Sequence, residues 1–513
     1  MNHKIKPVVA ALALALYAQG TLAAEEEVEN ASTWYEAGQQ ALQEAKRLYP
    51  NVRRAKNVIL IVGDGMGVST VTAARILDGQ MRGVDGEKNS LSFEKLPYLA
   101  LSKTYSANQQ TSDSAPTMTA MVTGIKTSDG VLSINQSVAR GEQDKAVIDA
   151  NKVATMLELA EMKGMSTGIV TTARLTHATP AATYAHSSER NWEADSNQPA
   201  GTTVKDIAAQ LIDNFGTGGI GNGLEVALGG GRSKFLPNTE TDPESTSKKG
   251  DRKDGRNLTT EWTSKFGGAY IWNKAQFDAI NPDTTSHLLG LFERSHMQYE
   301  ADRPNDTAGE PSVAEMTGKA IDVLKKNKKG YFLMVEGGRI DHGHHAGNAY
   351  RALTDTAALS EAVKTAMEKS DPKDTLIIVT ADHSHVFTIA GYPKRGNPIL
   401  GKVVAPGKTE FAKAADGLPY TTLAYANGRG FHTLETGGDT VYKEPVQAGR
   451  VADLTNVDTT DEGFHQEALV PLSSETHAGE DVAIFAGGPK AHLFHGVQEQ
   501  NYIFHVMKDA LGM

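Results

Sequence analysis

The chain has 513 residues, of which 39% are hydrophobic and 22% charged, so it can form one large α/β domain with insertions or two or three ordinary domains. Its 62 acidic residues against 51 basic ones give a net charge of −11, which argues against nucleic acid or an anionic membrane as a specific partner. Cysteine is absent, so thiol nucleophiles and thiolate ligands are excluded, and any metal must be held by His, Asp or Glu.

Residues 1–24 have the pattern of a signal peptide. Lys4 and Lys6 form the basic end, residues 7–18 an apolar run, and residues 21–24 a small-residue cleavage site. Three glutamates follow at once and argue against a buried N-terminal helix. We therefore predict export, to the periplasm or out of the cell, and no transmembrane segment in the mature chain, because no later stretch is apolar for 18 residues.

Residues 32–48 predict an amphipathic helix. Thr33 and Glu36 are spaced as a capping box. Apolar side chains recur at helical spacing on one face: Trp34, Ala37, Ala41, Ala45 and Leu48.

Short apolar runs recur along the rest of the chain and are typical of strands covered on both faces. They lie at residues 58–62, 168–170, 331–335, 376–379 and 482–485. Helical patterns stand between them, for example at residues 153–162 and 313–324. This alternation predicts an α/β fold with a large, mostly parallel central sheet and helices on both faces.

Two stretches interrupt the alternation. Residues 237–256 are polar and charged, and we expect an exposed loop there. Residues 391–475 are rich in Gly and Thr and come directly after the motif Asp-His-Ser-His at 382–385. A segment of that length predicts an inserted small subdomain.

Acidic and imidazole side chains follow the predicted strands. In an open parallel sheet, loops and ligands gather beyond the carboxyl ends of the strands. Taken alone, each such residue is more often a turn former or a polar group with a satisfied hydrogen bond. Here, however, four separate segments place acidic or imidazole side chains at one edge of the sheet. Asp341 and His345 are also spaced to share one side of a helical turn. Histidine nitrogen with carboxylate oxygen suits zinc. The residues are Asp64, Glu336, Asp341, His345, Asp382, His383 and His477.

A candidate nucleophile, Ser114, lies in Thr-Ser-Asp-Ser-Ala-Pro-Thr at residues 111–117, just before a helical pattern. The alternative is that Ser114 only caps that helix. A serine hydroxyl needs a base or a metal to act as a nucleophile. Because no Gly-x-Ser-x-Gly motif surrounds it, metal activation is the better explanation.

Several motifs in fixed order resemble the alkaline phosphatase family, and more closely its animal-type branch. The resemblance runs from about residue 32 to near the C-terminus. It implies a catalytic domain formed by residues 25–390 and 476–513, a crown-like subdomain at 391–475, and a homodimer in which residues 32–48 are an arm that grips the partner. The matching segments are residues 62–70, 113–115, 171–190, 336–345, 380–385 and 475–481.

The resemblance also implies roles for single residues. Two zinc ions and one magnesium ion per chain are expected, with Arg190 binding phosphate and His177 beside the magnesium, where some bacterial members have aspartate. Ala115-Pro116 departs from the small residue pairs of the family and implies a slightly different helix start. The implied ligands are Asp341, His345 and His477 for one zinc; Asp64, Asp382, His383 and Ser114 for the second; Asp64, Thr179 and Glu336 for magnesium.

Animal-type relatives carry a calcium site away from the catalytic residues. The matching ligands here would be Glu244, Glu293 and Glu310 with the backbone carbonyl of Phe292, all hard oxygen donors that suit Ca²⁺. The alternative is three unrelated surface glutamates.

The resemblance implies hydrolysis of phosphate monoesters to inorganic phosphate and an alcohol, with Ser114 phosphorylated on the way. A phosphodiesterase of the same fold remains an alternative, whereas a sulfatase would need a modified cysteine or serine in another motif. A non-enzymatic phosphate- or metal-binding protein is the third possibility, since it needs the anion site but no nucleophile.

Overall fold

The computed structural model describes residues 29–431, 434, 449–450 and 452–513. The chain forms two compact units, Met1–Tyr49 and Pro50–Met513. The predicted signal peptide, residues 1–24, lies outside the described residues. Among the helices that are described, none is long and apolar enough to cross a membrane.

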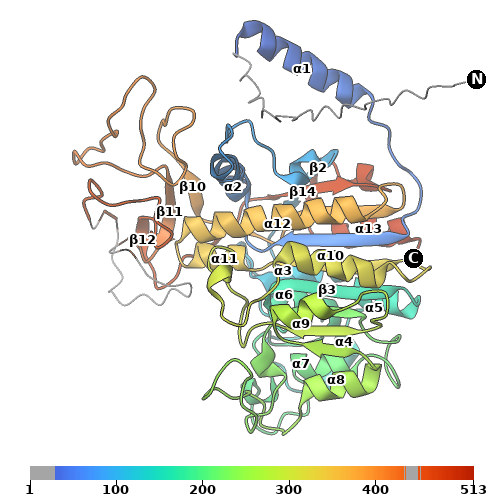
Figure 1. Ribbon diagram of the computed structural model, residues 1–513. Helices are drawn as coiled ribbons and strands as arrows, with labels where there is room; N and C mark the ends of the chain where they lie inside the picture. The colour runs from blue at the N-terminus through green and yellow to red at the C-terminus, as the bar shows by residue number, and fades with distance from the viewer. Residues whose placement is uncertain (1–28, 432–433, 435–448, 451) are drawn as a thin grey trace, which may run out of the picture. The chain divides into compact units, whose positions relative to one another are not determined.

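The first unit contains the helix α1, Ala31–Lys46 (Figure 1). Asn30 caps it, and the reciprocal partner of the capping box is Thr33, whose hydroxyl lies 3.0 Å from the backbone N–H of Asn30. The predicted box of Thr33 and Glu36 is therefore wrong, because the helix starts earlier and Glu36 accepts instead from Ser32 at 2.8 Å. None of the residues of α1 is buried, and Trp34 is 55% exposed.

A ten-stranded sheet forms the centre of the second unit, in the order β15-β2-β14-β8-β1-β7-β3-β4-β6-β5. Every neighbouring pair is parallel except the two that involve β14, so β14 alone runs against the others. The predicted mostly parallel α/β fold is confirmed. The strands are β1 (Asn57–Gly63), β2 (Tyr98–Lys103), β3 (Ser166–Arg174), β4 (Val226–Gly230), β5 (Ala269–Ile271), β6 (Leu288–Leu291), β7 (Tyr331–Gly337), β8 (Thr375–Ala381), β14 (Val482–Gly487) and β15 (Val497–Glu499).

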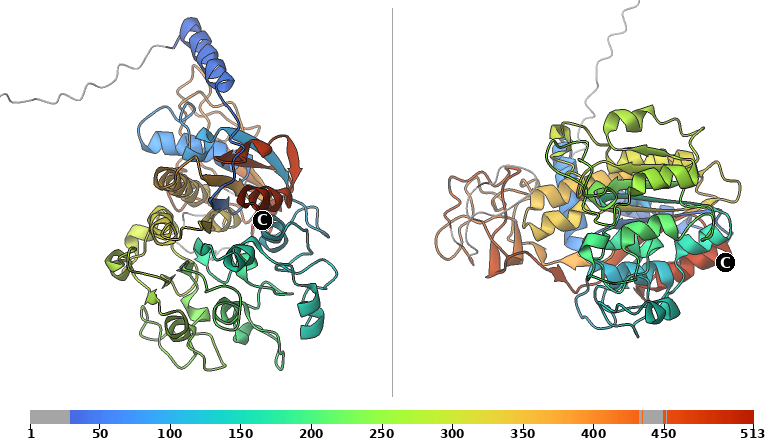
Figure 2. Two further views of the ribbon diagram at one scale, coloured as in Figure 1. Left: turned by 90° about the vertical axis from the view of Figure 1, so that its right-hand side faces the viewer. Right: turned by 90° about the horizontal axis from the view of Figure 1, so that it is seen from below.

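Helices cover both faces of this sheet (Figures 1 and 2). The central strand β1 is buried along its whole length, and its alternate residues enter two different cores: Val58 and Leu60 one, Ile59 and Ile61 the other. Because both faces are covered, a central strand is apolar at every position rather than at alternate ones.

The first core is completed by α3 (Ser114–Thr123), α5 (Met156–Met162), α6 (Ala178–Tyr184), α7 (Ile207–Asp213), α8 (Leu258–Phe266) and α13 (Tyr502–Leu511). The second core is completed by α2 (Val68–Met81), α9 (Lys274–Ala279), α10 (Val313–Leu324), α11 (Arg339–His345) and α12 (Ala349–Lys369). A short helix, α4 (Lys145–Asn151), packs in a smaller cluster. Helix α10 has the predicted bounds, whereas α5 begins at Met156 because Thr155 and Glu158 form its capping box.

Residues 391–475 contain most of a separate three-stranded sheet. It consists of β10 (Phe387–Ile389), β11 (Leu423–Gly428) and β12 (Ala468–Pro471), and Figure 1 shows it to the side of the main sheet. Phe431, Leu454 and Phe464 form a small core of their own there. These features support the prediction of an inserted subdomain, although residues 432–433, 435–448 and 451 of it lie outside the described residues.

The predicted loop at residues 237–256 has no helix or strand but is not simply exposed. Arg252 is fully buried and donates to Asp206 at 3.0 Å, and Asp242 pairs with the buried Arg232 at 2.9 Å. The sequence shows only that this loop is polar and charged, whereas the structure shows that ion pairs hold it against the domain.

Candidate active site

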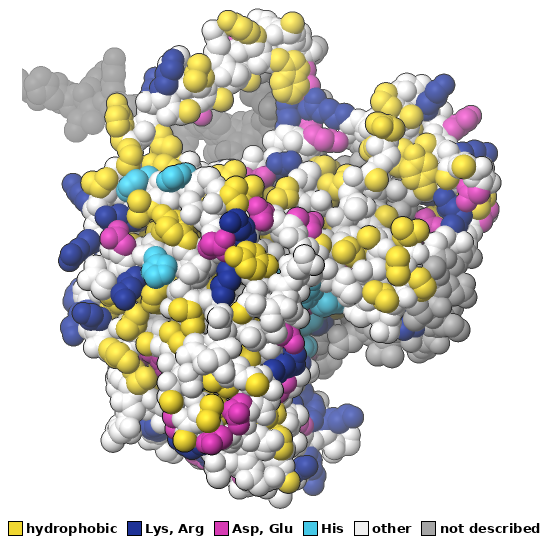
Figure 3. Space-filling view, turned by 180° about the vertical axis from the view of Figure 1, so that it is seen from behind, with side chains coloured by type: hydrophobic (Ala, Val, Ile, Leu, Met, Phe, Trp, Pro, Cys, Tyr) yellow, Lys and Arg dark blue, Asp and Glu magenta, His cyan; other side chains and the backbone are white. Residues whose placement is uncertain are grey.

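The predicted site residues meet at the carboxyl ends of β1, β7 and β8. His477 joins them although it precedes its strand, because β14 runs antiparallel to β8 and so begins where β8 ends. A two-residue pairing of β13 (His477–Ala478) with β9 (Ser384–His385) fixes this position. Figure 3 shows the surface hollowed beside the inserted segment, with histidine side chains in the hollow.

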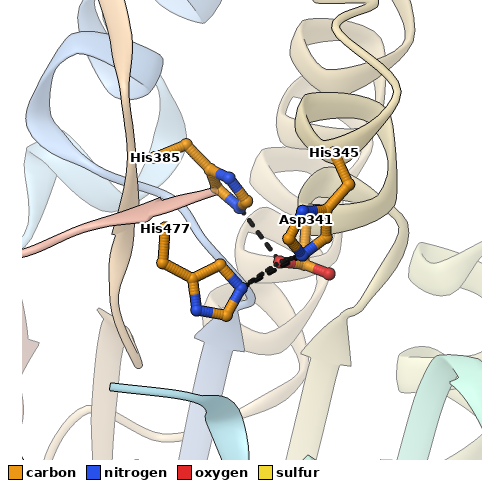
Figure 4. Close-up of side chains that lie close together, drawn as sticks. All are labelled: Asp341, His345, His385 and His477. Atoms are coloured by element: carbon orange, nitrogen blue, oxygen red, sulfur yellow. Dashed lines mark hydrogen bonds and ion pairs between the residues drawn. The ribbon is translucent and has the colours of Figure 1, made fainter. Parts of the chain in front are cut away.

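Asp341, His345 and His477 form one group, as predicted, with His385 added (Figure 4). Asp341 and His345 of α11 are one helical turn apart, which places them on one side of the helix. Asp341 Oδ1 lies 3.2 Å from a ring nitrogen of His345, 3.3 Å from Nε2 of His477 and 3.0 Å from Nε2 of His385. The three nitrogens therefore surround a single carboxylate oxygen.

The hydrogen bonds of His345 and His477 fix which ring nitrogen carries the proton. Nδ1 of His345 donates to the carbonyl of Glu475 at 2.7 Å, and Nδ1 of His477 donates to the carbonyl of Ser112 at 2.8 Å. In the neutral rings, both Nε2 atoms are then acceptors. These Nε2 atoms lie 3.1 Å apart and next to a carboxylate. Electron-rich atoms therefore meet in one place, and a cation would be a partner for all of them.

The second group contains Asp64, Asp382 and His383, all fully buried. Nε2 of His383 lies 3.3 Å from Asp64 Oδ1 and 3.4 Å from Asp382 Oδ2. Asp64 Oδ2, Asp382 Oδ2 and His383 Nδ1 are buried without a hydrogen-bond partner. Such unpartnered carboxylate oxygens are costly unless a cation pairs with them, so the residues present fit a metal ion.

Ser114 is the first residue of α3 and points at this second group. Its Oγ lies 3.1 Å from Nε2 of His383 and 3.4 Å from Oδ1 of Asp64. The cap of the helix is Asp113, whose side chain accepts from the N–H of Ala115 at 2.6 Å. The alternative that Ser114 only caps the helix is therefore wrong, and Pro116 occupies the first turn, where its missing N–H is not needed.

Arg190 reaches the same place from the loop after α6. Its Nη1 donates to Asp113 Oδ1 at 3.1 Å and its Nη2 to Nε2 of His177 at 3.0 Å. The guanidinium is thus held beside the N-terminus of α3, where its charge and the helix N–H groups both favour an anion.

The predicted magnesium residues form a third group, in which Asp64 and Glu336 come together with His177. The hydroxyl of Thr171 donates to Oε2 of Glu336, while Oε1 of Glu336 and Oγ1 of Thr179 are buried without a partner. Two free oxygens next to Asp64 fit a hard cation that retains several waters.

Burial and mutual repulsion dominate the electrostatics of the site. Burial, followed by repulsion from Asp382 and Asp341, holds the pKa of Asp64 well above its ordinary value, and burial raises the pKa of Glu336 to about 7. Burial alone would also raise the pKa of Asp341, but the attraction of the surrounding imidazoles, that of His345 first, outweighs it, so this pKa lies well below its usual range. Four carboxylates in one buried place can all be ionised only if cations neutralise them.

Two features of the site were missed in the sequence. His385 stands two positions after a predicted ligand, so the motif contained the signal, but its role depends on Asp341 and on Glu475, which are far away in the chain. His296 forms a second cluster with His177 and His342. The rings of this cluster contact arginines 174, 190 and 339 through ring nitrogens, which makes it a hydrogen-bonded support of the site.

The predicted calcium residues are brought together in part. Glu244 and Glu293 group with Asp306, while Glu310 lies beside Glu293 rather than in that group. Burial, with attraction to Arg232 opposing it, raises the pKa of Glu244 to about 7. One carboxylate oxygen on each of Glu244, Asp306 and Glu310 is buried without a hydrogen-bond partner, so the alternative of unrelated surface glutamates is wrong.

Comparisons with known proteins agree on one family. The sequence profile described as "Alkaline phosphatase" matches residues 55–513. The chain is 45% identical over 485 residues to the tissue-nonspecific alkaline phosphatase of Gallus gallus, covering 92% of this chain and 88% of that protein. It is 42% identical to an alkaline phosphatase of Gadus morhua, covering 92% and 95%. The solved alkaline phosphatase of Thermus thermophilus is similar with a TM-score of 0.63 at 25% identity, covering 91% and 93%.

Proposed function

The chain belongs to the alkaline phosphatase family and hydrolyses phosphate monoesters, and we propose that it does so through a phosphoserine at Ser114 between two zinc ions and one magnesium ion. The observation that carries this proposal is the convergence of imidazole nitrogens and carboxylate oxygens around the serine, several of which, among them Asp64 Oδ2 and Asp382 Oδ2, are buried without a hydrogen-bond partner. Nε2 of His345 and Nε2 of His477 face each other at 3.1 Å, and Ser114 Oγ lies 3.1 Å from His383.

The proposed metal ligands divide between the groups described above. Asp341, His345 and His477 would hold the first zinc, Asp64, Asp382 and His383 the second with Ser114, and Asp64, Thr179 and Glu336 the magnesium. Bound there, these cations would lower the pKa of a coordinated hydroxyl or water and neutralise the charge of the departing alcohol oxygen. A monoester carries about two negative charges near neutral pH, so its transfer gains most from such cations.

Ser114 acts as the nucleophile in the first step. Its Oγ gives its proton to water and forms a bond to phosphorus while the bond from phosphorus to the alcohol oxygen breaks, so the alcohol leaves on the opposite side with a proton taken from water. The half-buried cap Asp113 fixes the start of α3 and thereby aims this Oγ. In the second step, water attacks the phosphoserine, the bond between Oγ and phosphorus breaks, and phosphate is released.

Arg190 binds the oxygens that are not transferred. Its planar fork can make two charge-assisted hydrogen bonds to phosphate, and its contacts with Asp113 and His177 hold it facing the site before substrate arrives. Pre-oriented donors reduce the reorganisation needed in the transition state.

Two features favour a monoesterase over a diesterase or a simple binding protein. Arg190 and a cation at the third group, Asp64, Thr179 and Glu336, would supply more positive charge than a singly charged diester needs. Ser114 has its Oγ directed at the second metal group, which a protein that only binds phosphate would not need.

The test combines elemental analysis with turnover. Protein purified without chelator is expected to hold two zinc ions and one magnesium ion per chain and to hydrolyse an aryl phosphate much faster than its methyl diester. Equal rates on the two esters would favour a diesterase, and stoichiometric phosphate binding without turnover by the fully metallated protein would favour a binding protein.

A calcium ion at Glu244, Glu293 and Asp306, with Glu310 and the carbonyl of Phe292 nearby, extends the proposal. The unpartnered carboxylate oxygens of Glu244, Asp306 and Glu310 suit a cation that accepts six to eight oxygen ligands. Asp306 stands in this group where the resemblance implied Glu310.

We also propose a homodimer and export. The fully unburied α1 presents Trp34 and Leu42, each more than half exposed, and an apolar face of this kind suits burial against a second copy. The inserted segment 391–475 would form the crown-like subdomain that shapes access to the site. Export to the periplasm or beyond rests on the sequence pattern of residues 1–24.

A further inference from the structure

Glu475 contacts two residues of the first metal group at once. It is 2% exposed and lies between the last strand of the inserted segment, β12, and His477. Its backbone N–H donates to the carbonyl of His345 at 3.1 Å, and its own carbonyl accepts from Nδ1 of His345 at 2.7 Å. The backbone of Glu475 thus fixes both the position and the tautomer of one proposed ligand.

The carboxylate of Glu475 holds a second imidazole. Its Oε2 accepts from Nδ1 of His385 at 2.6 Å, and its Oε1 accepts from the backbone N–H of Val386 at 2.9 Å. Both oxygens are therefore used, and the orientation of the side chain is fixed from two sides. The contact to His385 is short, as expected for a charge-assisted hydrogen bond.

His385 is placed between two carboxylates. Its Nδ1 faces Glu475 and its Nε2 faces Asp341 Oδ1 at 3.0 Å (Figure 4 shows the contact with Asp341). Since carboxylate oxygens only accept, both ring nitrogens must donate, and a ring that donates from both nitrogens has no lone pair for a metal. His385 is thus unsuited as a fourth ligand, although it lies in the same group.

We propose that Glu475 is a positioning residue of the first zinc site, which orients Asp341 through His385 and His345 through its own backbone. This inference rests on the proposed function, because it presumes that Asp341, His345 and His477 hold zinc. The ring of His385 also stacks on that of His344, with centroids 4.8 Å apart, so His344 restrains the plane of the ring while Glu475 holds its Nδ1 edge. Because Glu475 ends the inserted segment, it also joins that segment to the metal site.

The substitution Glu475→Gln keeps the shape of the side chain and removes its charge. Partners of metal ligands typically contribute 10–100-fold to metal affinity. We therefore expect half-filling of one of the two zinc sites to need about 10–100-fold more free zinc than in the wild type, while the other site is unchanged. The measurement is a zinc titration of the full-length protein in a chelator buffer, with zinc per chain determined by elemental analysis.

Glu410→Gln is the matched control, because Glu410 is an exposed glutamate of the same inserted segment. It should fill both sites at wild-type zinc concentrations. Glu475→Asp, which keeps the charge and is shorter by one methylene, should retain zinc better than Glu475→Gln. Should it retain zinc no better, the carboxylate charge has no role and the proposal is overturned.

A double-mutant cycle tests whether Glu475 acts through His385. If it does, the double variant Glu475→Gln, His385→Asn should bind zinc only a little more weakly than whichever single variant binds zinc more weakly. Residues that act independently would give additive losses of affinity, and that result would contradict the proposal.

The visible absorption of the cobalt-substituted protein gives a second readout. It should change in Glu475→Gln at saturating cobalt and stay the same in Glu410→Gln, because only the former alters the geometry around Asp341.

The outcomes separate this inference from the proposed function. A wild-type protein that binds no zinc would refute the zinc site itself. Wild-type protein with two zinc ions and Glu475→Gln protein with the same two affinities would refute the role of Glu475 alone. Equal weakening of both sites would also refute it, because it would indicate a general loss of structure.

Discussion

Arg190 donates from Nη1 to Oδ1 of Asp113 at 3.1 Å, and this contact joins the arginine proposed to bind phosphate to the cap of the helix that begins with Ser114. Asp113 also accepts from the backbone N–H of Gly130 at 2.9 Å through its other oxygen. The nucleophile and the anion clamp are therefore oriented by one carboxylate, although they lie 76 positions apart in the sequence.

Arg190→Ala should lower kcat/KM on an aryl phosphate by roughly 10²–10³-fold, because one preorganised charged donor is lost while the metal groups remain. Steady-state kinetics with zinc and magnesium in excess would measure it. Metal content should be unchanged. A loss as large as that caused by removing the nucleophile would mean that Arg190 also organises the metal ligands.

Ser114→Ala should abolish the phosphoenzyme and lower turnover by several orders of magnitude, because water must then attack the ester directly. Trapping with ³²P-labelled phosphate followed by acid quench would detect the intermediate in the wild type only. Retention of zinc should separate this effect from loss of the site. Wild-type turnover in the variant would disprove the assignment of the nucleophile.

Calcium should raise the thermal midpoint of the folded protein without changing turnover, since a ligand that binds only the folded state stabilises it by mass action. Glu293→Gln should remove this rise. The exposed Glu368 provides a control, and Glu368→Gln should respond to calcium as the wild type does. Equal responses of all three proteins in differential scanning calorimetry would rule the site out.

Asp355 on α12 should make the stability of the protein fall as the pH rises. Burial, opposed by a hydrogen bond from the backbone of Glu300, raises the pKa of Asp355 to about 8 from an ordinary 3.8. Between these values the unfolded chain has lost the proton while the folded protein still holds it. The stability supplied by the protonated carboxyl is therefore complete below about pH 4 and is lost, by up to about 1.4 kcal/mol per pH unit, as the pH rises through the folded-state pKa.

Asp355→Asn removes this ionisation and keeps an oxygen that can accept from the N–H of Glu300, now 3.1 Å away. Its free energy of unfolding relative to the wild type should therefore increase from pH 5 to pH 8. Urea unfolding at several pH values would measure the difference. A constant difference across this range would show that Asp355 is ionised in the folded protein.

A chain that starts at Ala55 should dissociate into monomers or lose stability if α1 grips a second copy. Analytical ultracentrifugation over a range of concentrations would measure the mass. The full-length chain is the reference. An equally stable dimer without residues 1–54 would show that α1 does not hold the subunits together.

The central strands could be predicted from the sequence because their surroundings are simple. β1, β7 and β8 are buried on both faces, so their apolar runs are unbroken, and α10 carries a capping box from Ser312 to Glu315. Five strands of the sheet were missed: β2, β4, β5, β6 and β15. The runs of β4, β5 and β6 are only five, three and four residues long. In β2 buried and exposed residues partly alternate, and β15 has only three residues, which leaves a pattern too weak to recognise.

The candidate site residues could be proposed from the sequence because chemistry restricts their types: with no cysteine, a metal site needs His, Asp and Glu, and parallel strands deliver the residues that follow them to one edge. The sequence by itself therefore determined the fold class and indicated the proposed nucleophile and ligands. Only the tertiary structure decided that β14 runs antiparallel and so brings His477 to that edge, that Asp306 joins Glu244 and Glu293, and that Glu475 holds His385. These contacts join positions far apart in the chain, and the hydrogen bonds and charge pairs that make them leave no periodic pattern in the sequence.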